Sequence, residues 1–238
     1  MFDRIKKALS REPREPREDA KETLGPPSQL AGGAVSEWAS TRGFGFSTSG
    51  DGGTVTLEGR VQGKRWRMEL GRPTRNFIRG EELRGRAELG IDPNAAVLLL
   101  NRTLKEALEK KAYSAYTDDL QTMADPNLPE EMRWLAMYEE VGWNALPQAF
   151  RERYAVLADR RENALAWLGP ALTAMMMDWP DPPPGAETPF MLMLLRGKAY
   201  LRMEYQPADM PTLQHAALIF TSACESALGG LATPVDRA

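Results

Sequence analysis

The sequence predicts an α+β fold, in which an antiparallel sheet built from hairpins packs against helices after a disordered N-terminal segment. Two stretches of alternating hydrophobicity, residues 54–70 and 190–206, each contain a Gly-Lys pair at a turn, which is typical of β-hairpins. Amphipathic stretches with helical spacing lie between and after them. Tight hairpins favour this class over a doubly wound parallel sheet.

Composition limits the chemistry. The 238 residues are 42% hydrophobic and 26% charged, with a formal net charge of −3, which is typical of a globular chain. The only cysteine is Cys224 and the only histidine is His215, which excludes a disulfide framework and the multi-cysteine and multi-histidine zinc patterns. We therefore expect no metal and no cofactor. No export signal or bilayer-length apolar run is visible, so a cytoplasmic location is expected.

The first 33 residues form a separate region. They contain the charged repeat REPREPRED, followed by further prolines and glycines, and such a segment buries too little apolar surface to fold. Residues 34–238 are expected to be one α+β domain, with candidate sub-halves at 34–124 and 125–238. Ahead of the repeat, a short basic amphipathic stretch carries Phe2, Ile5 and Leu9. A frayed terminus is favoured over docking on an anionic membrane surface.

Residues 54–70 give the strongest local prediction. With Gln62-Gly63 at a two-residue turn, one face of the hairpin is apolar and the other is charged. The expected apolar pairs are Val55–Leu70, Leu57–Met68 and Gly59–Trp66. The expected charged-face pairs are Thr56–Glu69, Glu58–Arg67 and Arg60–Arg65.

The other elements follow from shorter signals. Strands are expected at residues 43–47, 83–89, 96–100 and 154–158, and a stiff connector at residues 179–185. Helices are expected to begin at three capping signals, which are Thr103 with Glu106, Asp159 with Glu162, and Asp209. A further helix is expected from about Asn127. Gly169-Pro170 should kink or split the helix that begins at Asp159. In the second hairpin, Gly197-Lys198 at the turn would pair Leu194 with Leu201, Leu192 with Met203 and Phe190 with Tyr205.

No catalytic constellation is visible. His215 faces away from the apolar stripe of the last helix, and Cys224 lies on it as an expected inert core thiol. The glycines around Gly43 and Gly45 match neither phosphate-loop pattern, and no esterase motif is present. No catalytic, cofactor-binding or metal-binding residue is therefore assigned.

Two surface features suggest binding. Between Glu58 and Arg86, nine basic and four acidic residues give an excess of five positive charges, so the rest of the chain carries −8. The candidate anion-binding surface is Arg60, Lys64, Arg65, Arg67, Arg72, Arg75 and Arg79. A solvated sheet face is the simpler interpretation, and with Trp66 on the apolar face, nucleic acid is not favoured as the partner. The candidate protein-docking surface is Met175, Met176 and Met177, although such methionines more often fill a core.

The resulting hypothesis is a non-enzymatic cytosolic protein that binds another protein as a partner-binding or accessory module. Two alternatives stay open. One is an anionic-surface binder, for membrane or nucleic acid, that uses residues 58–86. The other is an enzyme whose Asp/Glu/Arg chemistry has no sequence motif. The triplets Arg67-Met68-Glu69 and Arg202-Met203-Glu204 also leave a duplication of the hairpins open, with chance resemblance favoured.

Overall fold

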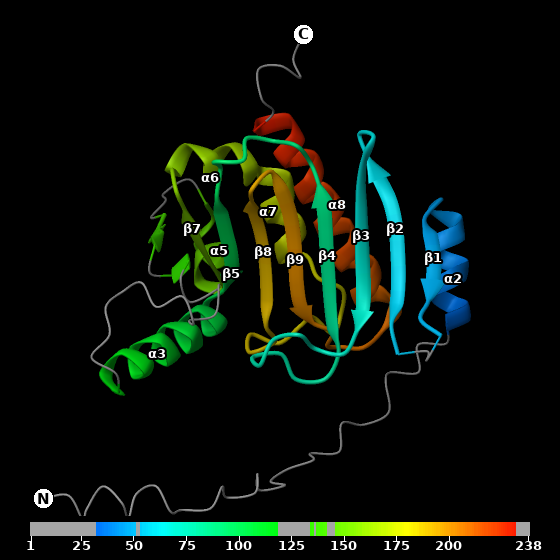
Figure 1. Ribbon diagram of the computed structural model, residues 1–238, viewed down its shortest axis with the longest axis horizontal. Helices are drawn as coiled ribbons and strands as arrows, with labels where there is room; N and C mark the ends of the chain where they lie inside the picture. The colour runs from blue at the N-terminus through cyan, green and yellow to red at the C-terminus, as the bar shows by residue number, and fades with distance from the viewer. Residues whose placement is uncertain (1–31, 51–52, 119–133, 136, 142–145, 232–238) are drawn as a thin grey trace, which may run out of the picture.

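One antiparallel sheet organises the chain (Figure 1). The computed structural model describes residues 32–50, 53–118, 134–135, 137–141 and 146–231. Across these residues the nine strands pair in the order β1 (Gly45–Thr48), β2 (Val55–Val61), β3 (Lys64–Gly71), β4 (Glu82–Glu88), β9 (Lys198–Glu204), β8 (Phe190–Leu195), β5 (Val97–Asn101), β7 (Tyr154–Ala158) and β6 (Glu139–Glu140). Every neighbouring pair is antiparallel, and the predicted α+β fold is confirmed.

Six helices complete this part of the chain. They are α2 (Gly32–Thr41), α3 (Arg102–Asp118), α5 (Gln148–Arg153), α6 (Arg161–Trp167), α7 (Pro170–Met177) and α8 (Met210–Gly230). Helix α2 was not predicted, and it begins at glycines that the sequence pattern grouped with the N-terminal segment. The rest of that segment, with Phe2, Ile5 and Leu9, lies outside the described residues, as does the expected helix start at Asn127. Strands β9 and β8 lie between β4 and β5, so the two sub-halves share one sheet.

The first hairpin has the predicted register. Val55 pairs with Leu70, Gly59 with Trp66, and Arg60 with Arg65. The turn residues Gln62 and Gly63 have φ angles of 47° and 78°, which is the conformation of a type I′ turn. The alternation of apolar and charged residues was therefore sufficient to fix this hairpin.

The second hairpin differs from the prediction by one residue at the turn. The turn residues are Arg196 and Gly197, with φ angles of 52° and 74°, so this is again a type I′ turn with glycine in its second position. Phe190 consequently pairs with Met203 rather than with Tyr205. The error arose because a glycine can occupy the first position of a type II′ turn or the second of a type I′ turn. The shift is two residues along the partner strand, so each side chain still faces the predicted side.

Two of the three capping predictions are wrong. Helix α3 already includes Thr103, whose hydroxyl donates to the carbonyl of Ala186. Helix α6 has no side-chain cap, because Asp159 instead accepts from the backbone N–H of Ala96, directly before β5. Asp209 does cap α8, accepting from the N–H of Thr212 at 2.8 Å. The two incorrect predictions have the same cause. Each side chain that was expected to cap a helix forms a hydrogen bond with a residue distant in the sequence instead.

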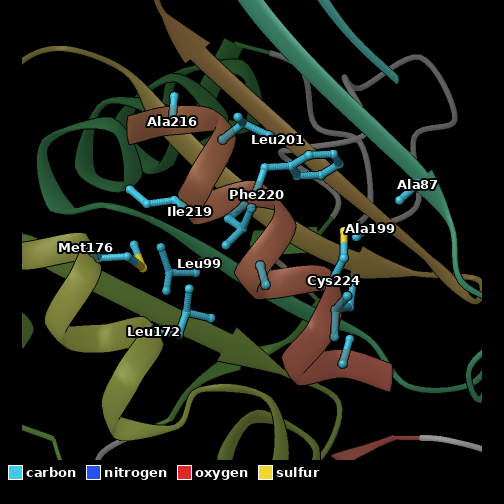
Figure 2. Packing of buried hydrophobic residues seen from close by; sticks show 14 of the residues in the cluster. Ala87, Leu99, Leu172, Met176, Ala199, Leu201, Ala216, Ile219, Phe220 and Cys224 are labelled. Carbon is cyan, nitrogen blue, oxygen red and sulfur yellow. The ribbon is translucent and has the colours of Figure 1, made fainter. Parts of the chain in front are cut away.

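The main core lies on one face of the sheet. Helices α5, α6, α7 and α8 contribute buried residues to it, and α2 contributes Val35 and Ala39 at the β1 end. Figure 2 shows Phe220 and Cys224 of α8 beside Leu201 and Ala199 of β9. A Cβ on Gly85 would lie 3.0 Å from the Phe220 ring, so a glycine in β4 lets α8 pack this closely.

The opposite face is divided into two halves. Over β5, β7 and β8 its side chains are apolar and join a second buried cluster with Leu104 and Leu108 of α3. Over β2, β3, β4 and β9 they are mostly charged. No helix of the described chain crosses this charged half, and α7 and α8 lie behind it in Figure 1. The candidate site lies on this uncovered half.

Candidate functional site

A groove lined by arginines runs across β2, β3, β4 and β9 on the charged half. Its volume is about 1160 Å³. Eight arginines and three glutamates line it, an excess of five positive charges, and we call it the arginine groove. These charged residues are Arg42, Arg60, Arg65, Arg67, Arg75, Arg84, Arg86, Arg202, Glu58, Glu69 and Glu88.

Strand alternation places these side chains on one face. Leu57, Met68 and Leu83 are buried against the helices, so their neighbours along each strand must point the other way. Rows of opposed residues then cross the sheet. One row runs from Glu58 through Arg67 and Arg86 to Tyr200.

Ion pairs order the centre of the groove. The guanidinium of Arg67 lies 2.6 Å from Glu69, and that of Arg84 lies 3.0 Å from the same carboxylate. Arg86 and Lys198 share Glu88 in the same way. Partial burial would raise the pKa of Glu88, but the hydrogen bonds from Arg86 and Lys198 outweigh it and hold the pKa below its ordinary value. These pairs fix the arginines in place for a ligand.

A buried carboxylate positions one wall of the groove. Glu82 is fully buried, and its oxygens accept from Arg202 at 2.6 Å and from the N–H and hydroxyl of Thr74. The hydrogen bonds from Thr74 fix the position of the loop between β3 and β4. Because Arg75 follows Thr74 directly, this loop places Arg75 at the groove.

The β2 end of the groove is different. Among the described residues Arg42, Arg60 and Arg65 form no ion pair, and Arg60 donates only to the carbonyl of Gly63. Arg60 and Arg65 are directly opposed across the hairpin. Like charges in this position repel each other and destabilise the pair. Three guanidinium groups at this end are therefore available to an external anion.

One buried N–H donor on the charged face has no acceptor among the described residues. It is Nε of Arg84, whereas Nε1 of Trp66 also lacks an acceptor but belongs to a side chain in the main core on the opposite face. A buried donor without a partner costs free energy, so such groups are rare in folded proteins. The Arg84 group is a donor rather than an acceptor, as are the guanidinium groups around it. This favours a ligand that carries acceptor oxygens.

The structure distributes the predicted anion-binding residues unevenly. Arg60, Arg65, Arg67 and Arg75 line the groove, whereas Lys64, Arg72 and Arg79 are not part of its lining. Reasoning from sequence left four groove arginines out of the candidate set, namely Arg42, Arg84, Arg86 and Arg202. Arg202 had a usable signal, since its triplet Arg-Met-Glu repeats that of β3 and both strands flank β4. Arg42 had none, because α2 was not predicted.

The other predicted residues lie away from the groove. His215 is half-buried on α8, with Nε2 2.9 Å from the carbonyl oxygen of Met175 and its ring against Trp179. Met176 is fully buried, and Met175 and Met177 are partly buried against the main core. Cys224 is buried as predicted, and burial raises the pKa of its thiol to about 12. Among the described residues, no group of three His, Cys, Asp or Glu residues could hold a metal ion.

Comparisons with known proteins add little. No family model matches the chain, and no curated protein matches it. Among solved structures, the chain is similar to the crystal structure of the mycobacterial trehalose monomycolate transport factor A, TtfA, with a TM-score of 0.47 and 10% sequence identity. The match covers 85% of this chain and 97% of that one. None of the described helices has the length and apolar character needed to cross a membrane.

Proposed function

We propose that this chain is a non-enzymatic binding protein that holds an anionic partner in the arginine groove. One observation carries the proposal: eight arginines line one groove, and the buried Nε of one of them, Arg84, lacks an acceptor among the described residues. Guanidinium groups bind carboxylates and phosphates through paired hydrogen bonds. An anion in the groove would supply the missing acceptor for Arg84 and offset the repulsion between Arg60 and Arg65.

A binding role fits the groove better than catalysis. Its lining contains neither histidine nor cysteine, and each of its three glutamates forms an ion pair with an arginine, so it offers no unpaired carboxylate as a general base. His215 and Cys224 belong to α8 on the other face of the sheet, and neither lines the groove. A cytosolic location remains part of the proposal, supported by the free, buried state of Cys224.

Charge reversal in the centre of the groove tests the proposal. Titrations would use four anionic probes in turn: inorganic polyphosphate, a glutamate-rich peptide, a single-stranded oligonucleotide and anionic vesicles. We expect at least one probe to bind, with an affinity that falls steeply with salt because the attraction is screened. The double variant Arg67→Glu/Arg86→Glu should weaken that binding at least about tenfold.

The control variant is Lys110→Glu/Arg161→Glu, which changes the net charge equally at exposed positions of α3 and α6. It should bind as the wild type does. A neutral variant, Arg67→Gln/Arg86→Gln, guards against misfolding, and its far-UV circular dichroism should match that of the wild type. Absence of binding by every probe, or an equal loss in the control variant, would overturn the proposed function.

A further inference from the structure

The β2 end of the groove combines unpaired arginines with an open strand edge. Strand β1 pairs with β2 only from Val55 to Glu58. On the N-terminal side of β1 the chain comes from helix α2, and it changes direction at Gly43, where φ is +68°. Within the described part of the chain, the last part of β2, Gly59–Val61, therefore has β3 as its only strand neighbour, and in Figure 1 β2 extends beyond the end of β1.

Hairpin geometry shows which backbone groups this edge presents. A two-residue turn is closed by a hydrogen-bonded pair, here Val61 with Lys64. Since hydrogen-bonded and non-hydrogen-bonded pairs alternate, Arg60 and Arg65 form a non-hydrogen-bonded pair, in which the two chains approach most closely. The N–H and C=O of Arg60 consequently point to the open edge, beside its own guanidinium.

From these features we propose that the groove takes an acidic polypeptide segment, anchored at the β2 edge. In this arrangement the backbone of the segment pairs with the N–H and C=O of Arg60, which extends the sheet by one short strand. Its carboxylates pair with Arg42, Arg60 and Arg65. Flanking acidic residues lie over the central arginines. This inference rests on the proposed function and names the class of partner.

Three observations favour a polypeptide over other anions. The backbone of a polypeptide satisfies both the N–H and the C=O of a strand edge, whereas polyphosphate carries acceptors alone. The outward positions of β2, β3 and β4 carry no aromatic residue, and Tyr200 of β9 packs partly against the second cluster, so nucleobases would find only one partly covered ring to stack on. A flat membrane surface would reach the rim of the groove but not the buried Nε of Arg84.

The interleaved glutamates point the same way. Glu58, Glu69 and Glu88 neutralise part of the positive charge, and a phosphate backbone with one charge on every unit would meet them repeatedly. A polypeptide can place acidic residues opposite the unpaired arginines and neutral residues opposite these glutamates. The free arginines at one end would thus select for the position of carboxylates along a segment as well as for total charge.

The test compares a fluorescent glutamate-rich peptide of about ten residues with polyphosphate, an oligonucleotide and anionic vesicles. We expect the peptide to bind the full chain most tightly, and Arg60→Glu/Arg65→Glu to weaken it at least about tenfold. The control Lys110→Glu/Arg161→Glu should leave its affinity within about twofold. A neutral Arg60→Gln/Arg65→Gln variant should also lose affinity while unfolding in urea no earlier than the wild type, since it removes a like-charge pair.

Amide hydrogen exchange gives the second readout. The amide of Arg60 should exchange more slowly with peptide bound and at an unchanged rate with polyphosphate bound. If polyphosphate, the oligonucleotide or vesicles bind and the peptide does not, the proposed function stands and the polypeptide inference is overturned. An Arg60 amide that exchanges equally fast with and without bound peptide would overturn it as well. If none of the probes binds, both proposals fall together.

Discussion

The two halves of the outward sheet face have the same backbone and opposite surfaces. The row that begins with Glu58 and Arg67 continues through Tyr200 to Met193, Leu98 and Leu157. The charge is lost between β9 and β8, and from there α3 together with Trp134, Leu135 and Tyr138 covers the sheet. The outward residues are therefore apolar where these segments cover them. The half without a helix is free to carry charge and to bind a ligand.

Tyr200 lies at the boundary between the halves. Its side chain is half-buried and packs against the second cluster, yet it also lines the arginine groove. Phe77, from the loop between β3 and β4, packs against the same cluster. Tyr200 therefore belongs both to the lining of the groove and to the packing of the covered half.

The largest expected effect comes from placing a charged side chain in the covered half, compared with placing an apolar side chain in the charged half. Leu100 is fully buried under α3, so Leu100→Glu would bury an unpaired charge and should lower the free energy of unfolding by about 4 kcal/mol or more. Arg86 occupies an exposed position in the charged half, and Arg86→Leu should change stability by less than about 0.5 kcal/mol. Urea denaturation of both variants measures the difference. Similar losses in the two variants would mean that the charged half is structurally constrained rather than free to bind.

A smaller, pH-dependent effect is expected within the charged half. The pKa of Glu88 lies below its ordinary value of 4.5 because Arg86 and Lys198 hydrogen-bond to it despite partial burial. A depressed pKa contributes stability above the unfolded value, and this contribution disappears as the pH falls through the folded value. Glu88→Gln should therefore lose less than about 1 kcal/mol at pH 7, since the pair is largely exposed.

The pH dependence of that variant provides its check. Thermal unfolding of the wild type and Glu88→Gln, compared from neutral to acidic pH, should show a gap that closes as Glu88 becomes protonated in the wild type. A gap that stays constant below pH 4.5 would show that the ion pairs with Arg86 and Lys198 are not its source.

How far the sequence predicts this molecule depends on the range of the interaction involved. The first hairpin was predicted residue by residue, because its alternation and its turn are both local. The helices expected at Thr103 and Asp159 are present, but the caps were wrong, because these side chains form hydrogen bonds with Ala186 and Ala96, both distant in the chain. The arginines of the hairpin were predicted as a surface, but the groove was not. Its depth depends on β9 lying next to β4, a pairing that joins residues about 120 positions apart.

The most direct test of the central claim is to map where an anionic ligand lies. Backbone chemical shifts of the ¹⁵N-labelled chain, recorded during titration with the glutamate-rich peptide, report every residue at once. The account predicts shift changes at residues 42–45 and on β2, β3, β4 and β9, with little change on α3, α6 or α8. Changes concentrated on those helices, or on the sheet half that α3 covers, would contradict it.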